Sequence, residues 1–466
     1  MADKSFDLVI LGGGTGGYST ALRAASLGLS VGLVEKDKVG GTCLHRGCIP
    51  TKALLHVAEL MEGIHEAADR WGIKASVEGV DYSATVANRE DIVTKNFKGL
   101  QSHLKKAKVE TFTAGGKLVA PDAVEVEGTG RITATKGVVL ATGSVPKSLP
   151  GLEIDGQRVI SSNHALQLDY VPKSVIVLGA GAVGSEFACF YRAMGAEVTL
   201  VEALVQVLPL EDADSGREVG KAMKRKGIDV RVDTKLDDAK VDDDSVTATL
   251  VDGKGKKAEV TAELLLVATG RAPVTEGLGY EDVGVTLDRG FVVPGNWDTL
   301  ETSVKGVYAV GDILPPPSLA LAHASFAEGM LVAETVAGVE SPPIDYAGVP
   351  RVTWSTPECA SVGLTEAQAK DQGHDVVVTK FPFNNIAKGM VHGQGGFVKL
   401  VAAKDGPVLG VHLVGARVTD LIAEAELIYN WEALPADVAQ FIHPHPTLSE
   451  AIGEAHLTLA GRPLHG

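Results

Sequence analysis

The sequence is poor in cysteine, in basic charge and in long apolar runs. Only four of its 466 residues are cysteine, too few for the disulfide framework of a small secreted protein. Acidic residues outnumber basic ones by 59 to 43, a formal net charge of −16, which argues against a nucleic-acid partner because phosphates need a basic face. The longest apolar runs, such as residues 264–268, have strand length and fall short of the roughly 18 residues of a membrane span. We therefore expect no nucleic-acid and no membrane partner.

The start of the chain has none of the features of a signal peptide. Residues 1–7 lead directly into the apolar run 8–11, with no basic region before it and no small-residue cleavage site after it. We expect the protein to be cytoplasmic. In that compartment a disulfide is more plausibly redox-active than structural.

What the sequence has in abundance is an alternation of β-branched runs and Ala/Leu-rich stretches, which is typical of an α/β fold. A strand at 8–11, a helix at 20–27 and a strand at 31–35 are expected. The same order recurs about 167 residues later, with the expected elements at 174–178, 186–194 and 197–202. Two further strands, 137–140 and 264–267, each run into Ala-Thr-Gly. The repeat predicts two Rossmann-like dinucleotide-binding domains.

From residue 345 onwards the pattern changes. The segments 376–383, 396–401 and 408–414 alternate like strands of an antiparallel sheet, and 420–432 and 450–460 are expected to be helical. This block predicts a C-terminal α+β domain. We predict four parts: an FAD-binding domain at 1–150, an NAD-binding domain at 151–280, a central domain completing the FAD site at 281–345, and a dimerisation domain at 346–466. The acidic stretch 237–244 is expected to be a solvated loop.

A glycine-rich turn connects the first strand to the first helix. Gly12, Gly14 and Gly17 occupy the positions of G-x-G-x-x-G. In this motif the first glycine allows a tight turn, the second lets the backbone approach a pyrophosphate, and the third lets helix and strand pack closely. The helix N-terminus then offers N–H groups and a positive dipole end to the diphosphate. Glu35, eighteen residues beyond Gly17, is placed to accept hydrogen bonds from a ribose diol.

The second copy of this turn has the same spacing. Gly179, Gly181 and Gly184 are followed eighteen residues later by Glu202. A carboxylate at that point favours a free 2′-hydroxyl and repels a 2′-phosphate, and residues 203–205 contain no arginine to hold one. The second nucleotide is therefore predicted to be NAD. Two dinucleotide sites in one chain indicate two dinucleotides in one reaction, most economically a flavin and a nicotinamide.

Two cysteines, Cys43 and Cys48, lie just after Glu35 and are flanked by glycines. Pro50 suits the first turn of a helix, so Cys48 is expected near a helix N-terminus, where the dipole stabilises a thiolate. A redox-active pair is the favoured interpretation. Two free thiols or half of a metal site are the alternatives, although the next cysteine, Cys189, is too distant for zinc-ligand spacing. Cys189 and Cys359 are expected to be inert.

Residues 40–52 read GGTCLHRGCIPTK and resemble the active-site segment of the flavin-dependent pyridine-nucleotide disulfide oxidoreductases, GGTC-x-x-x-GCIP-S/T-K. The resemblance extends along the whole chain and ends at HPHPTLSE, residues 443–450. It is strongest to the members that oxidise dihydrolipoamide with NAD. The NADPH-dependent members usually carry arginines in the second nucleotide site, which are missing here.

The resemblance implies roles for individual residues. Cys48 would lie against the flavin, Cys43 would exchange with the substrate, and Lys52 would lie close to the flavin and pair with Glu186. Gly270 and Arg271 would line the NAD site. The further FAD contacts implied are Gly116, Thr142, Gly143, Ser144, Asp312, Ala320, Leu321, Ala322 and His323. The sequence departs from the family at Val274, where relatives often have Asn, and at Ala114, where many have Gly.

The last pair of implied catalytic residues is His445 and Glu450. A thiol must lose a proton before it attacks a disulfide, so a base tuned near neutral pH is needed, and Glu450 would orient His445 as the acid of a triad does. Residues 447–450, Thr-Leu-Ser-Glu, also form a capping box for the last helix. His443 competes as the base, although the family spacing favours His445. In relatives this segment reaches the flavin of the other subunit, which implies a homodimer.

The implied activity is oxidation of dihydrolipoamide to lipoamide with reduction of NAD⁺, through the cysteine pair and FAD. The implied partners are a lipoyl group carried on an acyltransferase subunit and the other components of a 2-oxo-acid dehydrogenase complex. Two alternatives stay open at this point. One is an NAD-linked reductase of another small disulfide, and the other is a mainly structural subunit of a multienzyme assembly.

Overall fold

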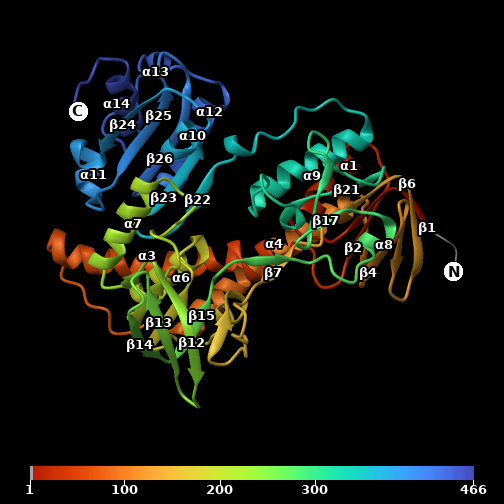
Figure 1. Ribbon diagram of the computed structural model, residues 1–466, viewed down its shortest axis with the longest axis horizontal. Helices are drawn as coiled ribbons and strands as arrows, with labels where there is room; N and C mark the ends of the chain where they lie inside the picture. Colours follow the sequence, from red (N-terminus) through yellow and green to blue (C-terminus); the bar gives the residue numbers. More distant parts are fainter. Residues whose placement is uncertain (1–3, 466) are drawn as a thin grey trace. The chain divides into compact units, whose positions relative to one another are not determined.

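The computed structural model describes residues 4–465 (Figure 1). The chain forms two compact units, and each consists of several segments. The first unit contains residues up to 54, 83–147 and 271–346, and the second contains 55–82, 148–270 and 347 to the C-terminus. Within the described residues no helix is both long enough and apolar enough to cross a membrane.

The first unit is built on a sheet with the strand order β19-β20-β21-β6-β1-β2-β3, with β4 and β5 attached beside β6. The strands β21, β6, β1, β2 and β3 run parallel to one another. The strand bounds are β1 Lys4–Leu11, β2 Val31–Glu35, β3 Glu110–Thr113, β4 Gly116–Ala120, β5 Ala123–Val126, β6 Gly130–Leu140, β7 Ser144–Pro146, β16 Arg271–Pro273, β17 Leu287–Asp288, β18 Phe291–Val292, β19 Pro294–Asn296, β20 Glu301–Thr302 and β21 Val307–Ala309. The helices are α1 Thr15–Ser26, α2 Gly41–Arg46, α3 Cys48–Trp71, α4 Tyr82–Lys106, α8 Tyr280–Val283, η1 Gly311–Ile313 and α9 Ala322–Ala337, although most of α3 is counted with the second unit.

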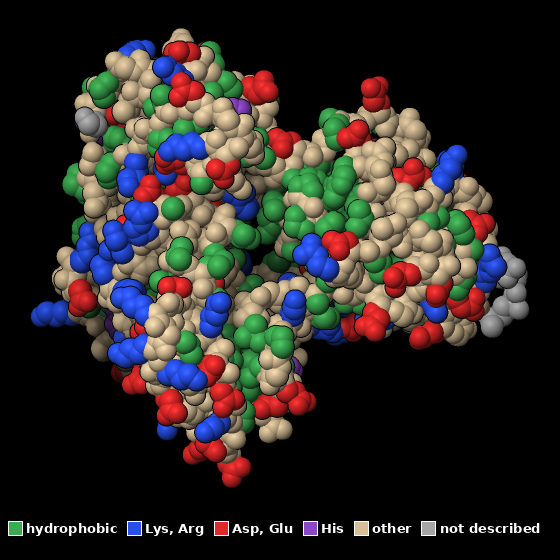
Figure 2. All heavy atoms as spheres, viewed as in Figure 1, with side chains coloured by type: hydrophobic (Ala, Val, Ile, Leu, Met, Phe, Trp, Pro, Cys, Tyr) green, Lys and Arg blue, Asp and Glu red, His purple; other side chains and the backbone are tan. Residues whose placement is uncertain are grey.

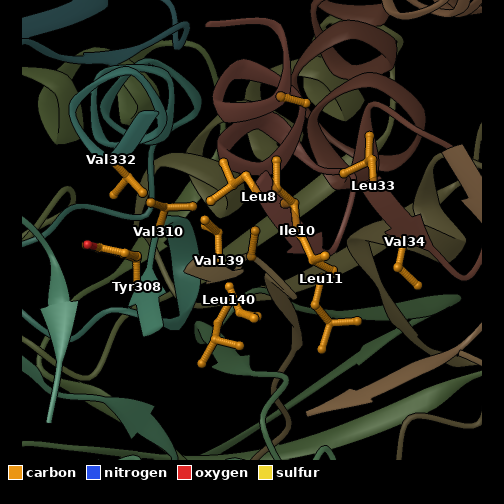
Figure 3. Close-up of a cluster of buried hydrophobic side chains, with 14 of the residues drawn as sticks. Leu8, Ile10, Leu11, Leu33, Val34, Val139, Leu140, Tyr308, Val310 and Val332 are labelled. Carbon is orange, nitrogen blue, oxygen red and sulfur yellow. The ribbon is translucent and has the colours of Figure 1, made fainter. Parts of the chain in front are cut away.

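The core of the first unit lies where β1 and β6 run side by side. Leu8 and Ile10 of β1 and Val139 and Leu140 of β6 are completely buried. Figure 3 shows these side chains meeting others from β2, β21 and α9. Because β1 and β6 are parallel and in register to their ends, with Leu11 opposite Leu140, the turns that follow them emerge at one edge of the sheet. Ligands of such folds bind at that edge.

The second unit contains a parallel sheet with the order β11-β10-β9-β15-β8, an antiparallel sheet β12-β13-β14, and an antiparallel sheet β22-β23-β26-β25-β24. Its strands are β8 Val159–Ser161, β9 Ser174–Leu178, β10 Glu197–Val201, β11 Asp229–Arg231, β12 Thr234–Val241, β13 Val246–Asp252, β14 Lys257–Ala262, β15 Leu264–Val267, β22 Arg351–Thr353, β23 Glu358–Gly363, β24 Val376–Pro382, β25 Phe397–Ala403 and β26 Val408–Gly415. Its helices are α5 Ser162–Ala165, α6 Ala182–Ala193, α7 Ala213–Arg225, η2 Tyr346–Gly348 at its boundary, α10 Glu366–Asp371, η3 Phe383–Asn385, α11 Ala387–His392, α12 Val418–Asn430, α13 Pro435–Val438 and α14 Glu450–Leu459.

The C-terminal sheet is covered by helices whose apolar residues complete its core. α12 packs against β23 and β26, and α14 packs against β24 and β25. Fully buried side chains from the strands, such as Val411 and Leu413, meet Ala425 of α12 and Ile452 of α14. The antiparallel sheet expected after residue 345 is therefore present, and α12 and α14 are held against it.

The α/β fold class is confirmed, with two dinucleotide-binding motifs and a C-terminal α+β domain. Both first helices begin earlier than the apolar pattern predicted, at Thr15 and Ala182. Glycine is a poor helix former. Because glycines lie in the first turns of these helices, the sequence pattern placed the helix starts too late.

The expectation of a loop at 237–244 is wrong for residues 237–241. Residues up to Val241 belong to β12, which pairs with β13 in an antiparallel hairpin. The charged side chains of this strand are exposed to solvent. Its sequence is therefore as acidic and polar as that of a loop. Figure 2 shows acidic side chains gathered toward the end of this hairpin.

Candidate functional site

The first glycine turn forms a cradle at the edge of the first unit's sheet. A Cβ atom on Gly12 would lie 2.2 Å from the Ala141 carbonyl oxygen, and one on Gly17 would lie 1.8 Å from the Gly12 oxygen. Glycine is therefore required at both positions by the packing of the protein itself. A Cβ on Gly14 would have no described atom within 4 Å. Packing does not demand glycine there, so the space in front of Gly14 is left for a ligand.

Glu35 closes this cradle from the end of β2. Its carboxylate accepts hydrogen bonds from the Gly13 N–H at 2.7 Å and from the Asp37 N–H at 2.8 Å. A cleft begins between Glu35 and Gly14, and its lining includes half of the residues predicted to contact FAD. The lining residues from that set are Gly12, Gly14, Glu35, Gly116, Thr142, Gly143 and Ser144, joined by the two departures Ala114 and Val274.

The far end of the predicted flavin site is a polar cluster within the same unit. Ser144 donates a hydrogen bond to the Asp312 carboxylate. Arg271 donates to the Ser144 hydroxyl and carbonyl oxygens at 2.6 Å and lies 3.4 Å from the Thr42 hydroxyl. The sequence associated Arg271 with the NAD site, but its guanidinium lies among these predicted FAD contacts. Residues 320–323 lead into α9, with Leu321 as its N-cap residue.

The turn that carries Asp312 depends on a residue that the sequence analysis missed. Glu328 of α9 is completely buried. Its carboxylate accepts hydrogen bonds from the Gly311 N–H at 2.6 Å, the Ser318 hydroxyl at 2.7 Å and the Tyr346 hydroxyl at 3.0 Å. Burial raises the pKa of Glu328, and these hydrogen bonds oppose the rise. Nothing in its sequence neighbourhood marks this role, because its partners come from three separate segments.

The cysteine pair lies beside the first cradle. Cys43 is in α2 and Cys48 is the first residue of α3. A Cβ on Gly41 would lie 2.7 Å from Gly14 Cα, so this glycine lets the cysteine segment pack directly on the glycine turn. Both cysteines are thiols in the structure. The hydrogen bond with Cys48, together with burial and the charge of Cys48, raises the pKa of Cys43 well above its usual range.

The pair therefore has the geometry of a dithiol in which Cys43 retains its proton. In residues 4–465 no group of three or more His, Cys, Asp or Glu side chains is arranged to hold a metal ion. Cys189 and Cys359 are buried. Burial raises the pKa of Cys189 to about 11 and that of Cys359 well above its usual value.

The second glycine turn repeats the first almost atom for atom. A Cβ on Gly179 would lie 2.5 Å from the Ala268 oxygen, and one on Gly184 would lie 1.8 Å from the Gly179 oxygen. A Cβ on Gly181 would meet no described atom within 4 Å. Glu202 accepts hydrogen bonds from the Ala180 N–H at 2.8 Å and the Leu204 N–H at 2.9 Å. The two cradles thus share the same required glycines, the same open glycine and the same carboxylate clamp.

Two other residues predicted at the second cofactor lie in the same unit. Gly270 follows β15 with a φ of +129°, and a Cβ on it would face open space. Glu186 of α6 is buried and accepts a hydrogen bond from the Trp354 N–H at 3.1 Å. Lys52 lies in the N-terminal part of α3. The pairing of Lys52 with Glu186 stays a prediction.

The C-terminal pair has the geometry of an oriented base. His445 Nδ1 lies 2.7 Å from Glu450 Oε1, and the other carboxylate oxygen accepts the Thr447 N–H at 2.7 Å. Burial raises the pKa of Glu450, but the hydrogen bonds from His445 and Thr447 outweigh it and lower the pKa overall. The His445 side chain is 73% exposed. Its second ring nitrogen is therefore presented outward for proton transfer.

The capping role is only partly realised. Helix α14 begins at Glu450 with Ser449 as its N-cap residue, and the Thr447 hydroxyl donates to the Pro444 oxygen rather than capping the helix. Glu450 thus performs half of a capping box, through Thr447, and also binds His445. His443 differs from His445, since its side chain is 12% exposed and its Nε2 lies 2.7 Å from Glu424 Oε1.

Taken by unit, the structure gathers the cysteine pair, the first cradle and the Ser144–Asp312 cluster in the first unit. It gathers the second cradle, Glu186, His445 and Glu450 in the second unit. The donor sets fit adenine dinucleotides, because each cradle combines an open glycine, an uncapped helix start and a carboxylate at the end of the second strand. The arrangement can therefore hold two dinucleotides and exchange thiols with a disulfide.

Comparisons with known proteins agree with this chemistry. Residues 6–329 match the family "Pyridine nucleotide-disulphide oxidoreductase", and residues 349–456 match its dimerisation domain. A dihydrolipoyl dehydrogenase of Bacillus subtilis is 41% identical over 99% of both chains. One of Zymomonas mobilis is 39% identical over 100% of both chains. The crystal structure of LpdA from Mycobacterium tuberculosis superimposes with a TM-score of 0.87 at 25% identity, covering 98% of this chain and 99% of that one.

Proposed function

Since the chain belongs to the family of pyridine nucleotide-disulphide oxidoreductases, we propose that it oxidises dihydrolipoamide to lipoamide and reduces NAD⁺. The observation that carries this function is the hydrogen-bonded pair Cys43 and Cys48 beside a dinucleotide cradle. Relatives that share 41% and 39% of its residues over their whole length are dihydrolipoyl dehydrogenases.

FAD is the resident cofactor, held by the first cradle, and NAD⁺ binds at the second. The helix start behind Gly14 would face the FAD diphosphate, and Glu35 and Asp312 would accept hydrogen bonds from its hydroxyl groups. Glu202 would likewise accept hydrogen bonds from the hydroxyl groups of NAD⁺, and it would repel a 2′-phosphate. Bound FAD supplies two-electron redox chemistry between the cysteine pair and NAD⁺.

The cysteine pair exchanges two electrons with the substrate. One thiolate of dihydrolipoamide attacks Cys43 of the Cys43–Cys48 disulfide, so a mixed disulfide forms and Cys48 leaves as a thiolate. The second substrate thiol then attacks its own mixed disulfide, closes the lipoyl ring and releases Cys43. One disulfide is formed and one is broken. The two electrons reside on the cysteine pair, with the proton on Cys43 and the charge on Cys48.

His445 supplies the base that this exchange requires. Each substrate thiol must lose its proton to attack, and an imidazole titrates in the right range. Glu450 holds His445 through Nδ1 at 2.7 Å, which keeps the outer nitrogen free to accept the proton and stabilises the imidazolium that results.

The working form is a homodimer in which His445 of one copy serves the cysteine pair of the other. The match to a dimerisation domain over residues 349–456 supports this assembly. The dimer would take its substrate from the lipoyl group of an acyltransferase subunit in a 2-oxo-acid dehydrogenase complex. A cytoplasmic location stays a prediction of the sequence.

The decisive experiment replaces the exchanging sulfur. The Cys43→Ser variant is expected to keep its FAD, because residue 43 lies outside the hydrogen bonds of the cradle, yet to lose lipoamide-dependent NAD⁺ reduction by a factor of at least about 10³, since no mixed disulfide forms. Cys359→Ser, which alters a buried cysteine, is the control and should retain activity. Full lipoamide turnover by Cys43→Ser would refute the proposed function.

A further inference from the structure

A second histidine–carboxylate pair lies next to the first. His443 Nε2 is 2.7 Å from Glu424 Oε1 on α12, just as His445 Nδ1 is 2.7 Å from Glu450 Oε1. Only one residue separates the histidines in the chain, but their exposure differs sharply: 12% for the His443 side chain and 73% for that of His445. His443 is therefore a fixed group behind an exposed one.

The protein makes room for the His443 ring. A Cβ on Gly453 of α14 would lie 2.5 Å from His443 Nδ1, so any larger residue there would displace the ring. The ring thus contacts α14 on one side and is bound to Glu424 of α12 on the other. Through this ring the segment that carries His445 is attached to both helices that cover the C-terminal sheet.

The charges around His443 form a balanced set. Glu424 raises the pKa of His443 through its hydrogen bond and charge, burial lowers it, and the charge of Glu450 raises it further, with an overall increase. His456 of α14 also faces this group, but it is buried and burial lowers its pKa to about 4, so it is neutral near pH 7. The charge of His465 lowers the pKa of Glu450, and His465 Nδ1 lies 2.8 Å from Glu454 Oε1. The raised pKa favours the protonated form of His443, whose charge opposes that of Glu424.

We propose that His443 is a positioning residue for the reaction, which holds the His445 segment and, through its neutral pair with Glu424, sets the proton affinity of His445. The electrostatic path runs through Glu450, because this carboxylate is bound to His445 and its charge also reaches His443. The inference rests on the proposed function in one respect, namely that His445 is the base.

Charge-balance variants test this role. His443→Gln keeps a hydrogen-bond donor toward Glu424 but leaves that carboxylate without its cation. The uncompensated negative charge favours the imidazolium form of His445, so the acid limb of the kcat/KM profile should move to higher pH by roughly half a unit. The double variant His443→Gln/Glu424→Gln is neutral again and should return the limb toward its wild-type position. A residue that only stabilises the fold would lower kcat/KM at every pH and would not be rescued by the second substitution.

A spectroscopic readout separates this inference from the proposed function. Titration of ¹³C-labelled histidines in the FAD-loaded protein reports the pKa of His445 directly, with its signal assigned from His445→Gln. The same upward shift in His443→Gln, reversed in the double variant, is expected even if lipoamide proves not to be the substrate. An unchanged His445 titration in His443→Gln, or a double variant as displaced as the single one, would overturn the inference.

If His443→Gln does not fold, Glu424→Gln serves in its place. Removal of the carboxylate should lower the pKa of His443 itself in the same spectra. In Glu424→Gln, residue 424 is uncharged and His443 is deprotonated more easily, so the two side chains together again carry no net charge. His445 should therefore titrate close to its wild-type position. A His443 signal that titrates as in the wild type would show that Glu424 does not hold its charge, and would contradict the inference.

Discussion

At the scale of single residues, the two cradles separate glycines that the protein needs from glycines that a ligand needs. A Cβ atom on Gly17 or Gly184 would lie 1.8 Å from a backbone carbonyl oxygen, whereas a Cβ on Gly14 or Gly181 would face open space. The motif itself assigns helix packing to its third glycine and the approach to a pyrophosphate to its second. We therefore expect substitution at the first pair to perturb folding, and substitution at the second pair to perturb binding.

This distinction gives a prediction for the second cradle. Gly181→Ala is expected to fold and to retain FAD, while its added methyl crowds the diphosphate and raises the KM for NAD⁺ about 10- to 100-fold, the equivalent of an overpacking cost of 1–3 kcal/mol. Gly184→Ala should instead reduce the yield of folded protein. Steady-state kinetics and the thermal midpoint distinguish the two, and a normal KM for NAD⁺ in Gly181→Ala would show that no diphosphate approaches this glycine.

Local motifs explain which site residues could be predicted from the sequence. Cys43, Cys48, His445 and the cradle glycines each lie in short segments whose chemistry is visible within a few residues. Glu328 could not be found this way, because it binds groups contributed by positions 311, 318 and 346. Glu424 likewise meets His443 across 19 residues. Their roles come from tertiary packing, which no local pattern records.

At the scale of elements, a buried lysine joins a helix start to the C-terminal sheet. Lys399 of β25 lies 2.8 Å from Asp212, 3.0 Å from Asp214 and 2.8 Å from Glu366, and its side chain is only 3% exposed. Asp212 is the N-cap of α7 and Glu366 begins α10. Burial raises the pKa of Asp212, but the hydrogen bond and charge of Lys399, the hydrogen bond from the Asp214 N–H and the charge of His412 together outweigh it and lower the pKa overall. This cluster fixes α7, α10 and β25 together.

Removal of this lysine should be costly and should depend on pH. Lys399→Met leaves buried carboxylates unpaired and is expected to lower the free energy of unfolding by about 3–5 kcal/mol at pH 7. Carboxylates with a lowered pKa stabilise the fold above their unfolded pKa of about 4, and this contribution is lost as the pH falls through the folded value. The deficit of Lys399→Met should therefore shrink as the pH falls below about 4, as measured by urea denaturation.

The matched control is Lys380→Met, since Lys380 is 49% exposed and lies 3.7 Å from Asp214. An exposed pair of this kind contributes less than about 1 kcal/mol. Equal losses in the two lysine variants, or a deficit in Lys399→Met that does not vary with pH, would contradict the role assigned to the buried cluster.

Element types were predictable because apolar periodicity decides them, and β2, β9 and β15 have the predicted bounds. Charge misled the prediction at 237–244, where an exposed hairpin strand carries aspartates. Helix starts were misplaced at the two cradles, because a ligand-binding turn uses glycines where a pattern search expects good helix formers.

At the scale of the whole molecule, the second unit exposes apolar side chains beside the His445 segment. Trp431 is 75% exposed, Phe441 68% and Ile442 97%, and Leu427 and Leu434 add to the same stretch of chain. All five lie within the match to the dimerisation domain. Large exposed apolar side chains so close together mark an interaction surface, and a second copy of the chain is the partner that the proposed homodimer requires.

Introduction of charge at this surface should separate the copies. Ile442→Asp is expected to shift the protein from dimer to monomer in analytical ultracentrifugation and to abolish lipoamide oxidation, because burial of an unpaired carboxylate costs several kcal/mol. Leu210→Asp, at a position 80% exposed outside the dimerisation domain, should remain dimeric and active. A dimeric and active Ile442→Asp would place the contact between copies elsewhere.

The family and its cofactors follow from motifs spread over the whole chain, so they were predictable from the sequence. The four-part division of the chain and the identity of the dehydrogenase complex stay predictions. They depend on contacts between distant segments of the chain and between proteins, and such contacts leave no short motif in the sequence.

The burial of Cys189 and Cys359 has a practical consequence. An alkylating reagent added to the native protein is expected to reach neither of them. If the cysteine pair works as proposed, the reagent modifies Cys43 and Cys48 only in molecules whose disulfide has been reduced. The mass of the intact polypeptide after such labelling therefore reports the fraction of molecules in which the cysteine pair is reduced, and no optical measurement is needed.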